Sequence, residues 1–156
     1  MRDHKFLQLA IELSKEALEN NKGGPFGCVS VKDGKIIGKG CNAVTSMNDP
    51  TAHAEIVAIR EACQNLNSFQ LNGCEVYSSC EPCPMCLGAI YWARPDAVYF
   101  ANTRSDAAEA GFDDAFIYDE INILPRDRKI KMVHAPDKEA LRVFKSWTEK
   151  ENKVKY

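Results

Sequence analysis

Two short motifs combine the ligands and the acid–base group of a hydrolytic metal site. His53 and Glu55 stand in Thr-Ala-His-Ala-Glu, and Cys83 and Cys86 stand in Pro-Cys-Pro-Met-Cys. One imidazole and two thiolates give a tetrahedral zinc ion three protein ligands and leave its fourth position open, whereas a structural zinc site closes all four. Such a zinc ion lowers the pKa of water toward about 7, and a free carboxylate nearby can take the released proton. The motifs therefore predict a zinc site that activates water, with Glu55 as the proton shuttle.

The position of the cysteine pair favours metal binding. A helix is expected over residues 84–93, because Pro84 suits its first turn. Free N–H groups and the partial positive charge at a helix N-terminus lower a thiol pKa and favour the thiolate that binds metal. A lone Cys-x-x-Cys equally fits a redox pair or two core cysteines. The His-x-Glu motif in the same chain makes zinc the favoured interpretation.

Cys80 extends the pair to Cys-x-x-Cys-x-x-Cys and raises the alternative of an iron–sulfur cluster. A bacterial cluster motif of this kind needs a fourth cysteine at position 90, followed by proline. Ile90 and Tyr91 stand there instead. Cys80 is therefore expected to lie beside the zinc site, at the end of the preceding strand, without being a ligand.

The elements that position these motifs alternate between strands and helices. Helices are predicted over residues 3–21, 53–66, 84–93, 105–110 and 137–149, and strands over 26–32, 35–44, 74–79, 97–101 and 131–134. Asp33-Gly34 is a strong hairpin turn signal between the first two strands. This order predicts a mixed sheet covered by helices on both faces. Chemistry in such sheets lies at strand ends near helix N-termini, where both motifs are expected.

Length and composition narrow the class of protein. A chain of 156 residues suits one domain, and a net charge of −2 argues against a nucleic-acid partner, whose binding domain is usually basic. No signal peptide is visible, and no apolar run reaches the ~20 residues needed to span a bilayer. The seven cysteines form an odd set without a signal peptide, which favours the reducing cytoplasm.

His-x-Glu followed by Pro-Cys-x-x-Cys is also the signature of zinc-dependent nucleobase deaminases. The chain resembles the cytidine deaminase superfamily and, within it, the small bacterial-type guanine deaminases. The residues that carry the resemblance are Gly24-Pro25-Phe26-Gly27, Asn42, 50–55, 79–86, 109–114 and Tyr156. The zinc motif belongs to the whole superfamily, whereas the segment 109–114 and the terminal tyrosine point to guanine.

The resemblance implies a fold and an assembly. The fold is a three-layer α/β/α sandwich around a five-stranded mixed sheet, formed by residues 1–156 as a single deaminase domain. One Zn²⁺ is expected per subunit. The protein is expected to form a homodimer in which segments from about residue 137 to 156 exchange between subunits and help to close each other's pocket.

The resemblance also implies roles for individual residues. Glu55 and Asp114 are the catalytic pair, and Asp114 recognises guanine or assists protonation at the edge that carries the amine. The residues implied in substrate binding are Phe26, Asn42, Ala54, Trp92 and Tyr156. Phe26 stacks on the purine, Asn42 hydrogen-bonds it, and Tyr156 reaches the pocket from the partner chain.

Each of these residues also has a structural interpretation. Asn42 could be a turn residue, Phe26 and Trp92 could be packing residues, and Asp113-Asp114 could cap a helix. Without the resemblance, the structural interpretation is the stronger one for Asn42, Phe26 and Asp114.

The function implied is zinc-dependent hydrolysis of guanine to xanthine and ammonia in purine metabolism. Three alternatives stay open: a tRNA adenosine deaminase, a deaminase of nucleosides such as guanosine or cytidine, and a non-catalytic zinc module. An RNA enzyme needs a surface for phosphates. The segment 137–156 carries six basic and four acidic residues, a net charge of only +2, which is typical of a solvated helix.

Overall fold

The computed structural model describes residues 3–156, which divide into two compact units, one ending at Asp114 and one covering Ala115–Tyr156. The elements of the first unit are α1 (His4–Glu19), β1 (Gly27–Lys32), β2 (Lys35–Cys41), α2 (Val44–Met47), α3 (Ala54–Leu66), β3 (Cys74–Cys80), α4 (Pro84–Ala93), β4 (Ala97–Asn102) and α5 (Arg104–Glu109). The second unit holds α6 (Ala115–Asn122), a 3₁₀ turn η1 (Pro125–Asp127) and α7 (Lys138–Glu149).

The sheet of the first unit has four strands in the order β2-β1-β3-β4. β1 pairs antiparallel with β2 and β3, and β3 pairs parallel with β4. The predicted α/β class with a mixed sheet is confirmed. The predicted fifth strand is wrong, because residues 131–134 form no strand. A strand needs a neighbour for its backbone N–H and C=O groups, and the described residues of the second unit form only helices, turns and loops.

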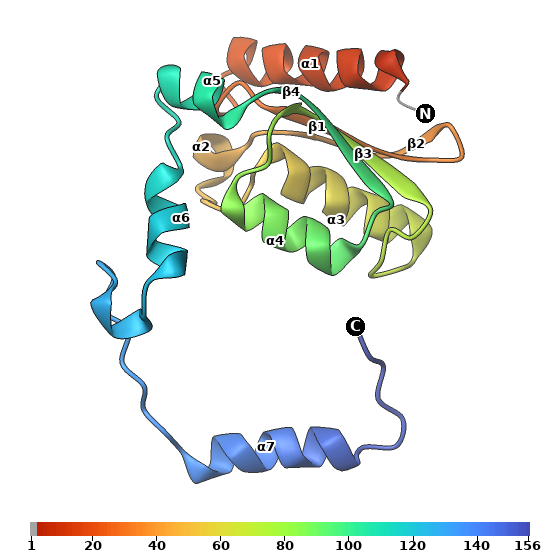
Figure 1. Cartoon of the computed structure of the whole chain (residues 1–156). Coiled ribbons are helices and arrows are strands. Elements are labelled where there is room, and N and C mark those ends of the chain that lie inside the picture. The colour runs from red at the N-terminus through yellow and green to blue at the C-terminus, as the bar shows by residue number, and fades with distance from the viewer. Residues whose placement is uncertain (1–2) are drawn as a thin grey trace. The chain divides into compact units, whose positions relative to one another are not determined.

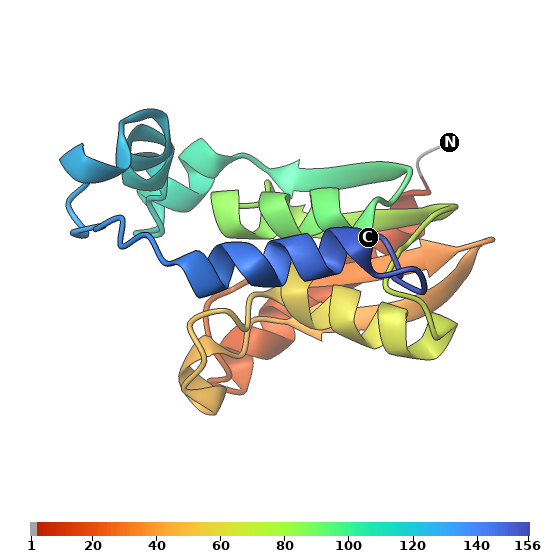
Figure 2. The same cartoon turned by 90° about the horizontal axis from the view of Figure 1, so that it is seen from below.

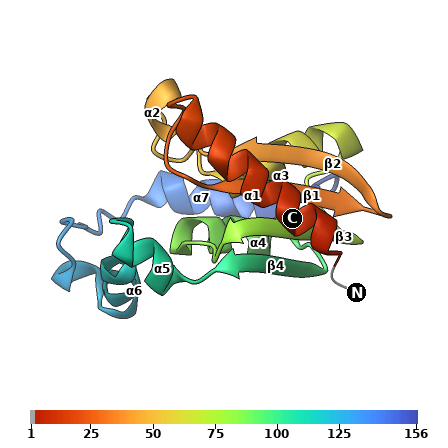
Figure 3. The same ribbon diagram turned by 90° about the horizontal axis from the view of Figure 1, so that it is seen from above.

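The alternation of side chains along the strands divides the core of the first unit between the two faces of the sheet. Val29 and Tyr77 pack against α1 in one buried cluster, while Cys28 and Val76 pack against Ala54 of α3 in another. Figure 1 shows α1 on one side of the sheet and α3 with α4 on the other. Viewed from above, α1 lies across β1 and β3, which it contacts (Figure 3). Viewed from below, α3 and α4 lie next to each other (Figure 2). The first unit therefore has three layers.

Two glycines of β2 bring α3 directly onto the sheet. A Cβ atom at Gly40 would lie 2.1 Å from the backbone oxygen of Ala54, and one at Gly38 would lie 2.3 Å from that of Ala58. Both distances are far below a van der Waals contact, so any side chain at either position would push the helix away. Because α3 begins with the His-x-Glu motif, the missing Cβ atoms set the height of that motif above the sheet.

We expect Gly40→Ala to destabilise the fold by about 1–3 kcal/mol, the usual cost of forcing extra atoms into a packed core. The midpoint and slope of urea unfolding of the zinc-loaded protein measure the change. Gly88→Ala is the matched control, because a Cβ at Gly88 of α4 meets nothing within 4 Å. That substitution should instead stabilise the helix by roughly 0.5–1 kcal/mol. Equal effects of the two substitutions would contradict the tight contact at Gly40.

The second unit contains no buried residue, and its longest helix, α7, is amphipathic. The apolar side chains that it leaves exposed are Leu141, Val143, Phe144 and Trp147. Helix α6, which directly follows Asp113-Asp114, was not predicted from the sequence. Across residues 3–156, no helix has both the length and the apolar character needed to cross a membrane.

Candidate metal centre and active site

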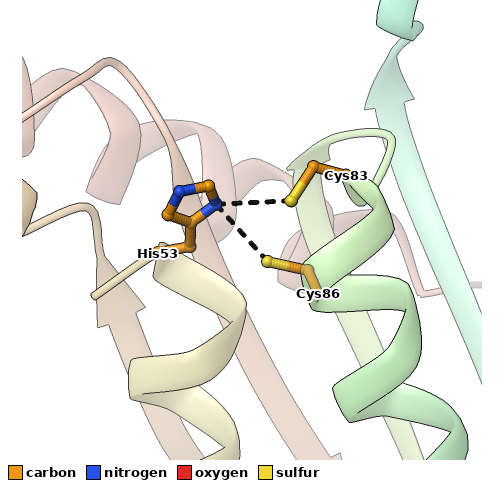
Figure 4. A group of neighbouring side chains, drawn as sticks. All are labelled: His53, Cys83 and Cys86. Atoms are coloured by element: carbon orange, nitrogen blue, oxygen red, sulfur yellow. Dashed lines mark hydrogen bonds between the residues drawn. The ribbon is translucent and has the colours of Figure 1, made fainter. Parts of the chain in front are cut away.

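The three predicted zinc ligands lie at the N-termini of two neighbouring helices. His53 is the N-cap residue of α3, Cys83 is the N-cap residue of α4, and Cys86 lies in the first turn of α4. Neither N-cap side chain bonds to its own helix backbone, so both are free to point elsewhere. Figure 4 shows the imidazole and the two thiols pointing toward one another across the gap between the helices.

The spacing of the three groups fits one zinc ion. Nδ1 of His53 lies 3.5 Å from Sγ of Cys83 and 3.5 Å from Sγ of Cys86. Bonds of about 2.3 Å to sulfur and 2.0–2.1 Å to nitrogen, set at the tetrahedral angle, would separate a sulfur from a nitrogen ligand by about 3.6 Å. Among residues 3–156, this is also the one group of three potential ligands whose donor atoms lie within 4.8 Å of one another. The chemistry and the spacing of the donors therefore both suit zinc.

The surroundings of the two thiols shift their pKa values. Interaction with the neighbouring Cys86 thiol, joined by contacts with His53 and with the backbone N–H of Cys86, lowers the pKa of the Cys83 thiol to about 4. The pKa of Cys86 is raised, first by its interaction with Cys83 and second by burial. The hydrogen bond to Cys83 raises the pKa of His53. These contacts favour the thiolate form of Cys83, which is the form that would bind a metal ion.

Glu55 lies beside the ligands and is not one of them. It sits in the first turn of α3 and is only 6% exposed. Its Oε1 accepts a hydrogen bond from Ser78 Oγ at 3.2 Å, and its Oε2 lies 3.5 Å from Sγ of Cys86, which donates to it. Burial raises the pKa of Glu55 above its ordinary value. A carboxylate with this environment and position can exchange protons with a group held at the metal site.

Cys80 lies outside the ligand group, as predicted. It is buried at the end of β3, and its thiol donates to the backbone oxygen of Thr103 at 3.5 Å. Burial raises its pKa to about 11, so it stays a thiol. A neutral thiol already engaged with a carbonyl is a poor metal ligand.

Asn42 follows β2 and is 5% exposed. Its Oδ1 accepts hydrogen bonds from the backbone N–H groups of Gly24 and Val44, both at 3.2 Å. Asn42 therefore stabilises the local turn, as its structural interpretation predicted. Because the amide oxygen is occupied, the Nδ2 group is what the side chain can offer to a ligand, and it can only donate.

Phe26 and Asp114 are far apart in the sequence and both belong to the first unit, where Phe26 packs against the buried cluster that includes Ala54. The Phe26 ring packs edge-to-face against Phe112, with centroids 5.0 Å apart. Asp114 is half-buried, and its pKa is raised first by burial and second by the charge of Cys83. The role of Asp114 stays a prediction. The pairing of Phe112 with Phe26 was not predicted.

The remaining predicted substrate residues differ in their surroundings. The side chain of Ala54 is fully buried in the core, so its backbone N–H, in the first turn of α3, is the group that could meet a substrate. Trp92 is exposed on α4, two turns after the ligands. Tyr156 is exposed and belongs to the second unit. The roles of all three residues stay predictions.

Water activation at an open zinc site, next to a carboxylate that carries protons, defines the class of zinc-dependent hydrolytic deaminases. The chain belongs to this class: residues 1–102 match the family described as the cytidine and deoxycytidylate deaminase zinc-binding region.

Individual relatives extend the match beyond residue 102. The chain is 53% identical to guanine deaminase of Bacillus subtilis (strain 168) over 156 residues, which covers all of both chains. The X-ray structure of guanine deaminase from Bacillus subtilis matches with a TM-score of 0.96 at 53% identity, covering 100% of this chain and 99% of the other. The tRNA-specific adenosine deaminase of Aquifex aeolicus is 38% identical over 146 residues, 93% of each chain.

Proposed function

We propose that this protein hydrolyses guanine to xanthine and ammonia. The observation that carries the proposal is the 53% identity to a guanine deaminase over the full length of both chains, including the second unit. The family match alone supports only zinc-dependent deamination, because it ends at residue 102. The tRNA-specific adenosine deaminase is the more distant relative, at 38% identity. A chain with a net charge of −2 also lacks the basic character of an RNA-binding protein.

Glu55 carries the protons of the reaction. His53, Cys83 and Cys86 would hold the zinc ion, which when bound would act as a Lewis acid and make water nucleophilic near neutral pH. Glu55 takes a proton from the attacking water and delivers it to the ring nitrogen beside the carbon that bears the amine, which makes that carbon more electrophilic. Glu55 then takes the remaining proton from the hydroxyl group of the tetrahedral intermediate and delivers it to the amine. The C–N bond breaks as the C=O bond forms, and ammonia leaves. One buried carboxyl serves as base and then as acid because its raised pKa lies closer to the working pH.

The purine is held by groups of the first unit. The Phe26 ring, steadied by Phe112, offers an aromatic surface on which a flat base can stack. The Nδ2 group of Asn42 donates to an acceptor on the purine, and the backbone N–H of Ala54 supplies a second donor. Trp92, which is exposed on α4, is a further substrate contact in our proposal.

Asp114 and Tyr156 complete the site in our proposal. Burial and the neighbouring Cys83 raise the pKa of Asp114, and the Arg104 guanidinium opposes this shift. A carboxyl tuned in this way can accept a hydrogen bond from the amine edge of guanine and assist its protonation. Tyr156 is assigned to the pocket of the partner chain, as a wall that helps to exclude water.

The proposed assembly is a homodimer in which the segment from about residue 137 exchanges between subunits. The apolar side chains of α7 are exposed within one chain, and the outer face of α4 also exposes Leu87, Tyr91 and Trp92. Exposed apolar surfaces of this kind mark interfaces. The partner is a second copy of the chain. The proposed compartment is the cytoplasm, because all seven cysteines are free thiols. No nucleic acid or membrane partner is expected.

The direct test is ammonia release from guanine by the purified, zinc-loaded protein, followed by the change in purine absorbance. Adenine, guanosine, cytidine and a tRNA with adenosine at the wobble position are the comparison substrates. We expect guanine to have the highest kcat/KM. Deamination of the tRNA with none of guanine would replace our proposal by the RNA-editing alternative.

Asn42→Asp separates the two roles of Asn42. Aspartate keeps an oxygen that can accept from Gly24 and Val44, but it removes the donor offered to the purine. We expect folding to be retained and kcat/KM for guanine to fall about tenfold, the effect of losing one hydrogen bond worth about 1.5 kcal/mol. Asn42→Ala should in addition lower the unfolding midpoint, because two backbone N–H groups lose their partner. Unchanged kinetics in Asn42→Asp would remove Asn42 from the substrate site.

A further inference from the structure

Ser78 of β3 is the side chain that holds the carboxylate of Glu55. Its Oγ lies 3.2 Å from Oε1 of Glu55, and both residues are buried. We propose that Ser78 is a positioning residue for deamination: it anchors Oε1, so that Oε2 is the oxygen that takes and delivers protons. This inference rests on the proposed function and identifies which oxygen of Glu55 transfers protons.

The hydroxyl of Ser78 has a defined direction. A serine hydroxyl has one hydrogen to donate and two lone pairs that accept. The backbone N–H of Cys80 donates to Ser78 Oγ at 3.5 Å, which occupies a lone pair. The hydrogen of the hydroxyl is then left for Glu55, whose carboxylate can only accept when ionised.

The strand that carries Ser78 is paired on both sides. β3 lies inside the sheet, and Ser78 stands in register with Cys28 of β1 on one side and with Phe100 of β4 on the other. Glu55 is therefore held from two elements, by its own backbone in α3 and by its carboxylate oxygen from β3. Groups fixed on packed secondary structure hold a catalytic side chain more accurately than groups on loops.

The two oxygens of Glu55 have different neighbours. Oε2 lies on the side of the metal ligands, 3.5 Å from Sγ of Cys86. A cysteine that binds zinc does so as a thiolate and has no hydrogen to donate. Among the side chains of residues 3–156, Ser78 is then the one donor to Glu55 that remains when the site holds its metal. Oε2 is left facing the reacting groups while Oε1 stays anchored.

The neighbouring serines show that this contact is specific to position 78. Ser79 points to the other face of the sheet, as expected from the alternation of side chains along a strand, and accepts from the backbone N–H of Gly27 at 3.0 Å. Ser30, on β1, is equally buried, but its hydroxyl has no hydrogen-bond partner. Ser30 therefore provides a matched control for the removal of a buried hydroxyl.

The kinetic test compares Ser78→Ala, Ser78→Thr and Ser30→Ala as zinc-loaded proteins with guanine. We expect Ser78→Ala to lower kcat about tenfold, the lower end of the effect of losing a group that orients active-site residues, with KM and zinc content unchanged. Threonine keeps the donor and should restore most of the activity, whereas Ser30→Ala should behave like the wild type. If Ser78→Ala keeps the wild-type kcat, or if Ser30→Ala loses as much, Ser78 does not position Glu55.

A structural readout makes the inference independent of the substrate. In a crystal structure of zinc-loaded Ser78→Ala, we expect the Glu55 carboxylate to rotate or to occupy two conformers, while His53 and the cysteines stay in place. An unmoved carboxylate would overturn the inference. If the wild type releases no ammonia from guanine, the proposed function fails, and this crystal structure still decides the role of Ser78. Should Ser78→Ala not fold, Ser78→Cys, with its weak donor, takes its place in both measurements.

Discussion

Glu55→Gln is expected to lower kcat for guanine by about 10²–10⁴-fold, the usual contribution of a general acid–base group. Glutamine has nearly the same shape, and its amide oxygen can still accept from Ser78. It cannot carry a proton between water, ring nitrogen and amine. The variant should therefore fold, bind zinc and bind guanine while losing the proton transfers. Steady-state kinetics, with zinc content measured on the same samples, provide the test.

The zinc content decides how a loss of activity in Glu55→Gln is interpreted. If the variant lost its metal together with its activity, Glu55 would belong to the ligand set and would leave no free carboxylate to shuttle protons. If zinc stayed and kcat did not fall, the non-catalytic zinc module would become the better interpretation of the motif. Cys86→Ser provides the opposite pattern as a control, because loss of a thiolate ligand should remove zinc and activity together.

The metal ligands could be predicted from the sequence because their geometry is local. Two cysteines at positions 83 and 86 share a helix turn, and His53 and Glu55 share the start of another helix. Only one long-range fact was needed, that the two helix N-termini meet, and the alternation of strands and helices supplies it. Helix α4 begins and ends where Pro84 and Arg94-Pro95 indicate.

The contacts that tune the site could not be predicted in the same way. Ser78 and Glu55 are 23 positions apart and meet only because β3 passes under the first turn of α3. Gly40 has no sequence signal for its close approach to Ala54 beyond being a glycine in a strand. Such contacts depend on the height and register of packed elements, which residue types alone do not determine.

The prediction of a fifth strand was wrong for a related reason. Residues 131–134 are Lys-Met-Val-His, a short segment with two central apolar residues, and strand formation depends on a partner as well as on residue type. The chain supplies none among the described residues of its second unit. The same unit leaves the apolar stripe of α7 exposed. The exposed apolar stripe of an amphipathic helix predicts that a partner covers it, and says less about the fold of the single chain.

Deletion of residues 151–156 tests whether a partner subunit closes the pocket. After Glu55→Gln, it should cause the largest loss of activity. The deletion removes Tyr156 and the end of the chain but keeps α7 and its apolar side chains, so the dimer should survive. We expect kcat/KM for guanine to fall about 10²-fold, because a pocket that loses a wall holds its substrate less accurately. Sedimentation or size-exclusion measurements establish the assembly state, and Tyr156→Phe is the milder control that keeps the ring. A fully active monomer would contradict the exchange.

Mixing two defective chains separates exchange between subunits from closure within one chain. The Glu55→Gln chain has an intact C-terminus but no proton shuttle, and the deleted chain has the shuttle but no Tyr156. If each pocket is closed by its partner, a mixed dimer contains one complete site. Random pairing of equal amounts should then restore about a quarter of wild-type activity, since half of the dimers are mixed and each has one working site of two. If each chain closes its own pocket, co-expression gives no more than the average of the two variants, because no dimer contains a complete site.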